Sequence, residues 1–158
     1  MGLDMYLTAK KLVTPEVTKE KATDDLGDWI EVGDLKDPWW NTDNDTFVAV
    51  TLDSWRKANE IHKWFVDNVQ GGEDQCNAFP VSAEHVDTLL ALCKEVLADQ
   101  SKAEDLLPTQ SGFFFGSTDY DEYYYQDLTH TVRLLETVKI MMAQTEPADV
   151  IVEYQSSW

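Results

Sequence analysis

The thiol and imidazole groups are the side chains of this sequence best suited to nucleophilic catalysis. Cys76 could work with His62 or His85, but no local motif around these residues is typical of a cysteine nucleophile. Cys93 repeats with apolar residues at helical spacing and is predicted to be buried. The separations between these four residues match no zinc-binding pattern, and the sequence has no serine-hydrolase, zinc-protease or phosphate-binding glycine motif. We assign no catalytic residue, no metal ligand and no cofactor.

Carboxyl groups outnumber every other ionisable group. The 158 residues include 30 Asp and Glu against 12 Lys and Arg, which gives a net charge of −18. Nucleic-acid phosphates and anionic membrane surfaces both require basic side chains, so we expect neither as a direct partner. The charge leaves three readings: a basic protein partner, a bound metal ion, or acidity that serves solubility alone.

Acids and aromatic residues occur together in two segments. Three carboxylates at 119–122 stand at a predicted helix start, where capping and the helix dipole alone would explain them. The tyrosines at 120 and 123–125 cannot all face a core, because consecutive helical residues point in different directions. Tyr and Trp are favoured anchors in protein interfaces. The candidate partner-binding residues are Asp119, Tyr120, Asp121, Glu122, Tyr123 and Asp127, with Trp39, Trp40, Asp43 and Asp45 in the second segment.

An alternative site of a different class would be a pocket for a small anionic ligand. Arg56 would pair with the anion, and His62 lies on the inner edge of a predicted helix. Phe114 and Ser117 would complete the pocket from a glycine-flanked loop. An ion pair on the helix surface for Arg56, and a buried, hydrogen-bonded role for His62, are the simpler explanations of these two residues.

Strands are predicted from short apolar runs and from alternation. Alternating apolar residues at 3–7 are typical of a strand, and short strands are also expected at 29–32, 47–50 and 150–154. The three phenylalanines between Gly112 and Gly116 predict either a short buried strand or a packed loop. The residues between 102 and the third predicted helix otherwise form a connection.

Three helices are predicted from apolar residues at spacings of three and four. The first spans 53–69 with its first residue, Asp53, as the cap, the second begins after Ser82, and the third runs from Asp119 or Asp121 to about Gln144. Helices between terminal strands predict an α+β fold, with one small sheet formed partly by the terminal strands and covered by about three helices.

Residues 1–158 are expected to form a single domain, with an irregular acidic segment at about 14–45. The first residues lack the basic and apolar stretches of a secretory signal. No apolar run approaches the roughly 20 residues needed to cross a bilayer. These features predict a cytoplasmic protein.

Four sequence blocks are distinctive when they are taken together. They are Gly2-Leu3-Asp4-Met5-Tyr6-Leu7, the helix segment from Trp55 to Phe65, the loop from Leu107 to Thr118, and the terminal Tyr154-Gln155-Ser156-Ser157-Trp158. Over nearly its full length the chain resembles a family of small uncharacterised proteins encoded by bacteriophages and prophages. The resemblance implies a bacterial host cytoplasm as the setting, and it supplies no catalytic residues.

Charge, motifs and resemblance together predict a non-enzymatic binding protein whose partner is a basic host protein. Carboxylates spaced like phosphates can occupy a nucleic-acid groove, so the leading hypothesis is a DNA-mimicking inhibitor of a host nucleic-acid enzyme or defence system. The alternative is a small anionic-ligand-binding protein or enzyme, with a pocket around Arg56, His62 and the Phe113–Ser117 loop.

Overall fold

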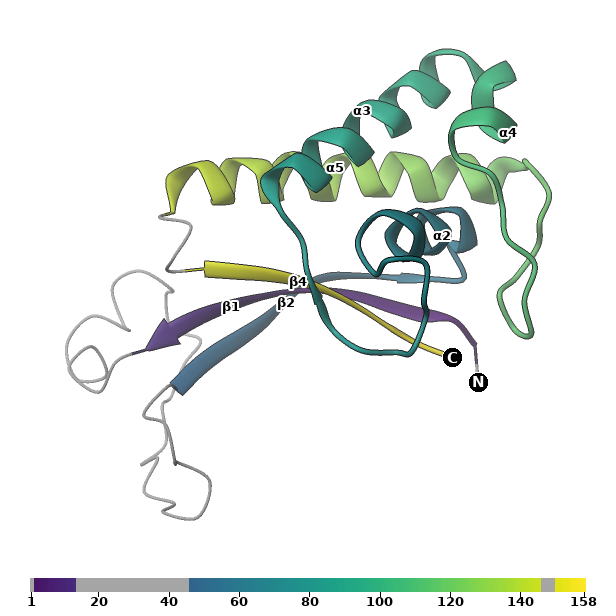
Figure 1. The fold of residues 1–158 in the computed structure, drawn as a ribbon. Coiled ribbons are helices and arrows are strands. Elements are labelled where there is room, and N and C mark those ends of the chain that lie inside the picture. The colour runs from purple at the N-terminus through teal and green to yellow at the C-terminus, as the bar shows by residue number, and fades with distance from the viewer. Residues whose placement is uncertain (1, 14–45, 146–149) are drawn as a thin grey trace.

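The computed structural model describes residues 2–13, 46–145 and 150–158, and the strands at its two ends lie side by side (Figure 1). β1 (Asp4–Val13) pairs antiparallel with β4 (Val150–Ser157). Met5 and Leu7 of β1 are fully buried, as the alternation in the sequence predicted. The prediction that the terminal strands share one sheet is confirmed.

Two further strands complete an antiparallel sheet with the order β2-β1-β4-β3. β2 (Thr46–Arg56) pairs with β1, and the short β3 (Phe79–Pro80) pairs with β4. Together with the helices over one face, this sheet confirms the predicted α+β fold.

Strand β2 is longer than predicted and takes the place of the first turn of a predicted helix. The prediction that Asp53 caps a helix is wrong, because Asp53 lies in β2 opposite Leu7 of β1. Trp55 is buried between two exposed neighbours, which fits a strand, but its position also fits a helical stripe. The chain leaves the sheet at Lys57, where φ is 63°, and α2 (Asn59–Asn68) begins two residues later.

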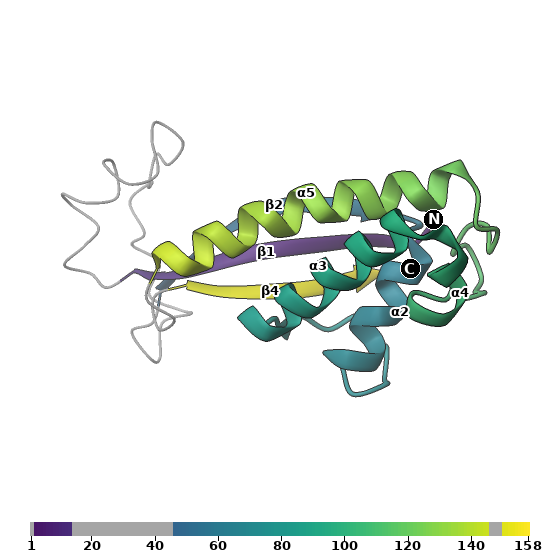
Figure 2. The same ribbon diagram turned by 90° about the horizontal axis from the view of Figure 1, so that it is seen from above.

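Helices α2, α3 (Ala83–Ala98) and α5 (Glu122–Gln144) lie over the same face of the sheet. Figure 2 shows α5 running along the sheet, with α3 beside it. Ser82 caps α3 by accepting a hydrogen bond from the backbone N–H of His85, as the sequence predicted. The predicted extent of the third helix is confirmed as well.

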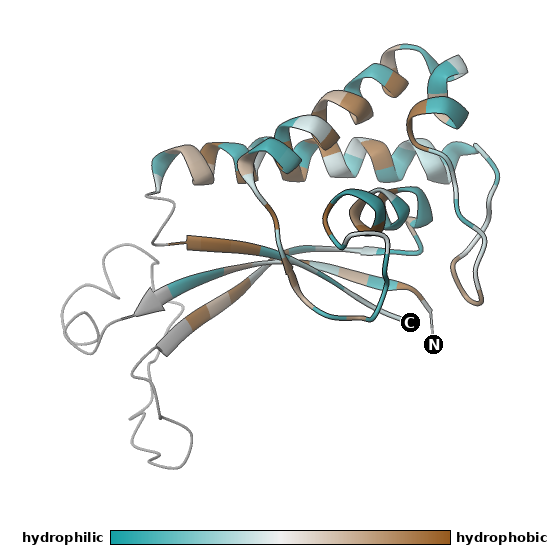
Figure 3. Ribbon diagram, viewed as in Figure 1, coloured by the Kyte–Doolittle hydropathy of each residue, from teal (hydrophilic) through white to brown (hydrophobic). Residues whose placement is uncertain are grey.

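For the segment between α3 and α5, one prediction needs correction and one open alternative is decided. A 3₁₀ turn (Gln100–Lys102) and the short helix α4 (Ala103–Leu106) stand at the start of the expected connection. The phenylalanine triplet forms a loop and no strand: Phe113 is 82% exposed, whereas Phe115 is buried. Figure 3 shows the hydrophobic tip of this loop extending away from the helices.

Aromatic contacts join the helices to the sheet. The ring of Phe65 in α2 stacks on Tyr154 of β4, with 3.9 Å between the ring centres. The indole N–H of Trp55 donates to the hydroxyl of Thr131 at 2.8 Å, which ties β2 to α5. These contacts fix the end of β2 and the start of α2 relative to α5.

The predicted strand at 29–32 and the candidate residues Trp39, Trp40, Asp43 and Asp45 lie outside the described residues. In the part of the chain that the structure describes, none of the helices combines the length and the apolar character that spanning a membrane would require.

Candidate functional site

A cavity of about 450 Å³ opens beside the first turns of α5. Its walls come from the end of β2, the first turn of α2, the loop before α5 and α5 itself. Its volume lies within the range of small-ligand pockets, but its lining is more polar than most. The charged residues that line it are Arg56, Lys57, Glu60, Asp119, Asp121 and Asp127.

Asn59, the first residue of α2, fixes the loop that forms one wall of the cavity. Its amide nitrogen donates to the backbone oxygens of Phe115 at 3.2 Å and Ser117 at 2.8 Å, and its side-chain oxygen accepts from the N–H of Gln110 at 2.9 Å. Gly116 has a φ of 97°, and a Cβ atom at this position would lie 3.1 Å from the Cβ atom of Lys57, the residue that follows β2. A glycine therefore allows this close approach of the loop.

Asp121 sets the position of the α5 wall. Its carboxylate accepts hydrogen bonds from the backbone N–H groups of Tyr123 at 2.9 Å and Tyr124 at 3.2 Å, so it is the cap of α5. The Tyr124 hydroxyl donates to the backbone oxygen of Leu107, and its ring is buried. Tyr123 is 74% exposed, which confirms that the clustered tyrosines do not all face the core.

Glu60 is the most unusual group in the lining. Its side chain is only 3% exposed, and its Oε1 atom has no hydrogen-bond partner among the described residues. Burial, with a smaller contribution from the nearby carboxylates of Asp127 and Asp121, raises the pKa of Glu60 to about 8. A carboxyl group of this kind is largely protonated at pH 7, yet it lines a cavity into which a ligand could bring a compensating charge.

Asp127 lies one turn further along α5 than Tyr123 and shares the electrostatics of Glu60. Burial raises its pKa to about 6, Asp121 adds to this rise, and His130 opposes it. Perturbed carboxyl groups that gather in one cavity are typical of functional sites, although structural networks can produce them too.

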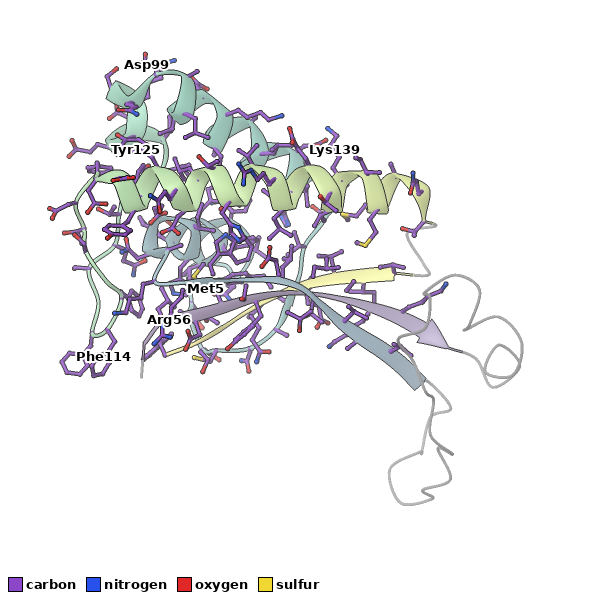
Figure 4. The ribbon with its side chains drawn as sticks, turned by 180° about the vertical axis from the view of Figure 1, so that it is seen from behind. Met5, Arg56, Asp99, Phe114, Tyr125 and Lys139 are labelled. Atoms are coloured by element: carbon purple, nitrogen blue, oxygen red, sulfur yellow. The ribbon has the colours of Figure 1, made fainter. Side chains whose placement is uncertain are left out.

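Two basic residues, Arg56 and Lys57, line the opposite wall of the cavity. Arg56 is paired with Asp4 at 3.7 Å, and most of its side chain is exposed. Figure 4 places Arg56 and Phe114 at the same end of the molecule as Tyr125 of α5. With four carboxyl groups against Arg56 and Lys57, the cavity carries an excess of acid.

The structure brings together four of the candidate partner-binding residues. Asp119, Asp121, Tyr123 and Asp127 all line the cavity. Glu122 is exposed beside them. Tyr120 does not line the cavity; its ring packs against Tyr124, with 5.0 Å between the ring centres.

The residues of the alternative anionic-ligand pocket are separated. Arg56 and Ser117 line the cavity, but His62 does not. His62 is fully buried, with one ring nitrogen 2.8 Å from the Tyr154 hydroxyl and the other 2.9 Å from the Asp74 carboxylate. Burial lowers its pKa, against the opposing effect of Asp74.

The two cysteines occupy different surroundings. Cys93 is fully buried in α3, as predicted, and burial raises its pKa to about 12. Cys76 is a half-buried free thiol in the loop after α2. Both ring nitrogens of His62 are engaged by other side chains, so His62 is not placed to activate Cys76.

Glu60 was missed by sequence reasoning, because a glutamate in the first turn of a helix is ordinarily an exposed residue that favours the helix dipole. One signal was present: Trp64 follows four residues later on the same face. Helix α2 is buried on most of its circumference, including Trp64. Groups of α5 and Cys93 of α3 lie close to Glu60, so its surroundings come from helices that follow later in the chain.

Comparisons of the chain with protein-family models, with curated proteins and with solved structures give no match.

Proposed function

We propose that this chain is a non-enzymatic binding protein that presents the cavity face at the start of α5 to a basic protein. The observation that carries the proposal is the gathering of Asp119, Asp121 and Asp127 around one cavity with the buried Glu60. A face of this charge attracts a basic partner and steers its approach.

The acids of this face differ from those further along the helices. Among the described residues, Asp87 pairs with Lys139, and Glu136 pairs with Lys94. No salt bridge within the described residues involves the acids at 119–127. The charges of the exposed Asp119 and Glu122 are therefore available to a partner.

Exposed aromatic side chains accompany the acids. Tyr123 lies at the cavity itself, and Phe113 lies at the tip of the adjoining loop, with 74% and 82% of their surfaces exposed. Aromatic residues are enriched among the side chains that dominate binding energy in protein interfaces. An acidic face with aromatic anchors suits a specific partner better than it suits solubility alone.

The partner class that we propose is a nucleic-acid-binding protein of a bacterial host. Such proteins carry grooves lined with Lys and Arg, and a face rich in carboxylates can occupy a groove of this kind in place of phosphates. The resemblance to phage and prophage proteins supplies the setting, which is the host cytoplasm, and the activity would be inhibition.

The test is capture of a partner by the tagged protein from a bacterial lysate. At about 50 mM salt the Debye length is about 14 Å, and at about 500 mM it is about 4 Å. We expect a basic nucleic-acid-binding protein to be captured at the lower salt and lost at the higher. The variant Asp119→Lys/Glu122→Lys should abolish capture while it spares the Asp121 cap.

The matched control is Glu73→Lys/Glu84→Lys, which makes the same change in net charge at two exposed acids that do not line the cavity. Equal loss of capture in both double variants would show that net charge alone matters, and it would overturn the assignment of the face. Unchanged capture by the Asp119/Glu122 variant would overturn it as well.

A small anionic ligand is the second candidate, because Arg56, Lys57 and Ser117 line one wall of the cavity. An anion would have to enter against four carboxyl groups, which disfavours it. If this candidate is correct, Arg56→Ala should abolish ligand binding, and the Asp119→Lys/Glu122→Lys variant should bind an anion such as phosphate more tightly than the wild type does.

A further inference from the structure

Glu60 is a buried acid, and the fold leaves one of its two carboxyl oxygens without a partner in the described part of the chain. Only 3% of its surface is exposed, and it is one of the residues that line the cavity. Its Oε1 atom has no hydrogen-bond partner among the described residues. Buried polar groups in folded proteins are nearly always hydrogen-bonded, and an unpaired one is destabilising. Oε1 itself is enclosed, so a partner that approaches from the cavity meets this oxygen when the Glu60 carboxyl group turns toward the lining.

The charges around Glu60 define the kind of partner. Asp121 and Asp127 lie close enough to raise its pKa. Of the two local bases, Arg56 is already paired with Asp4, and no salt bridge within the described residues joins Lys57 to Glu60. An anion would add to the repulsion between these carboxylates, and a neutral ligand would leave it in place. A cation would relieve it and allow Glu60 to ionise.

We infer that this cavity binds the guanidinium group of an arginine side chain, with Glu60 as the acceptor at its inner wall and Asp127 beside it. The inference deepens the function proposed above and rests on it: the arginine would belong to the basic partner protein.

Arginine fits the cavity better than lysine for three reasons. Its planar fork of N–H donors can bond two carboxylates at once, and its charge persists in a buried site. It is more weakly hydrated than an ammonium group, so it enters a partly enclosed cavity with less loss of solvation. The ring of Tyr123 lies in the same lining, is 74% exposed and offers a face for stacking.

Binding of the guanidinium group is then coupled to release of the proton from Glu60. The groups that face Glu60 are Asp121, Asp127 and Tyr124 from α5, Cys93 from α3, and Arg56 and Lys57 from the end of β2. Since the pKa of Glu60 is about 8 without ligand, a cation that requires the ionised carboxylate displaces close to one proton at pH 7. The affinity should therefore rise about fivefold between pH 7 and pH 8.

The experiment is calorimetric titration of the full chain with N-acetyl-L-arginine amide, which has no other titratable group. N-acetyl-L-citrulline amide is the matched probe, because its urea group has nearly the same shape without the charge. We expect the citrulline probe to bind about tenfold more weakly or not at all. The arginine heat should vary with the ionisation heat of the buffer, which reports the proton release.

Glu60→Gln is the decisive variant, because an amide has the shape of the protonated acid and should preserve the fold. It should weaken binding of the arginine probe about tenfold and abolish the buffer dependence. Glu84→Gln makes the same chemical substitution at an exposed residue of α3 outside the cavity and should bind as the wild type does. Equal binding of both probes, or unchanged binding by Glu60→Gln, would overturn the inference.

The two proposals fail separately. If the wild type and Glu60→Gln capture the same basic protein equally, and neither binds the arginine probe, the cavity inference is wrong and the binding face stands. If the probe binds as expected but no basic protein is captured, the cavity takes a free small guanidinium compound and the proposed partner is wrong. Competition of the probe with the captured protein supports both.

Discussion

The side-chain amide of Asn59 donates to the backbone oxygen of Ser117 at 2.8 Å, and so joins the first turn of α2 to the loop on the far wall of the cavity. The same side chain bonds the backbone of Phe115 and of Gln110. One buried residue thus holds three points of a loop that has no strand or helix of its own near its tip. The shape of the cavity depends on this residue, which lies next to Glu60 in sequence.

Asn59→Ala should therefore destabilise the protein and loosen the cavity. Three hydrogen bonds are lost, and buried backbone groups are left without partners, so the free energy of unfolding should fall by about 2 to 4 kcal/mol. Urea unfolding followed by circular dichroism measures the change. Asn68→Ala is the matched control, because the amide of Asn68 is exposed and bonds only to Trp64 of its own helix. A loss no larger than that of the control would contradict the role of Asn59.

Glu60→Gln should make the protein more stable, by an amount that depends on pH. The pKa of Glu60 is about 8 in the folded state and 4.5 in an unperturbed carboxyl group. Between these values the folded state holds a proton that the unfolded state has released, so the stability of the wild type falls as pH rises from about 4.5 to about 8. The variant lacks this loss, and at pH 7 its advantage should be about 3 kcal/mol.

Thermal or urea unfolding at several pH values between 4.5 and 8 tests this prediction. The difference between Glu60→Gln and the wild type should grow steadily across the interval, while Glu84→Gln should track the wild type throughout. A difference that is constant with pH would mean that Glu60 ionises normally. Functional sites often reduce the stability of a fold, so a substitution that removes binding at such a site is expected to stabilise the protein.

Local sequence patterns correctly predicted the long helices and strands that bury only one face. Apolar residues alternate at 3–7, and they repeat at helical spacing in the part of α3 that contains Cys93. Each pattern fits only one type of secondary structure, because one face of the element packs on the core. The boundary between β2 and α2 was not predictable in this way. Trp55 satisfies both a strand and a helix pattern, and only its pairing opposite Met5 decides between them.

The candidate site was predictable from the sequence in part. The acids at 119–127 could be found because they cluster at a helix start, and the structure adds that they surround a cavity. Glu60 was missed although Trp64 lies on its face, because the groups around it come from α3 and α5, about 30 to 60 residues later in the chain. His62 was correctly expected at the inner edge of its helix, but its partners Asp74 and Tyr154 are distant in sequence.

Asp74 is expected to be the main side-chain link between the last residues of the terminal segment and the loop after α2. Its carboxylate accepts hydrogen bonds from the hydroxyl of Ser156 at 3.0 Å and from the indole N–H of Trp158 at 2.5 Å, and it lies 2.9 Å from a ring nitrogen of His62. Asp74→Ala leaves the buried His62 and Ser156 without this partner. The free energy of unfolding should fall by about 3 kcal/mol.

Asp67→Ala is the comparison that separates this network from ordinary surface charge. Asp67 is exposed and pairs only with Lys63 on the same helix, an arrangement that contributes no more than about 0.5 kcal/mol. Hydrogen exchange adds a second readout, because the amides of β4 near Ser156 should lose protection in Asp74→Ala and keep it in Asp67→Ala. If the two variants lose equal stability and β4 stays protected in both, the strand is held by Tyr154 and the core, with Asp74 contributing little. The arginine probe should bind Asp74→Ala as it binds the wild type, since Asp74 does not line the cavity.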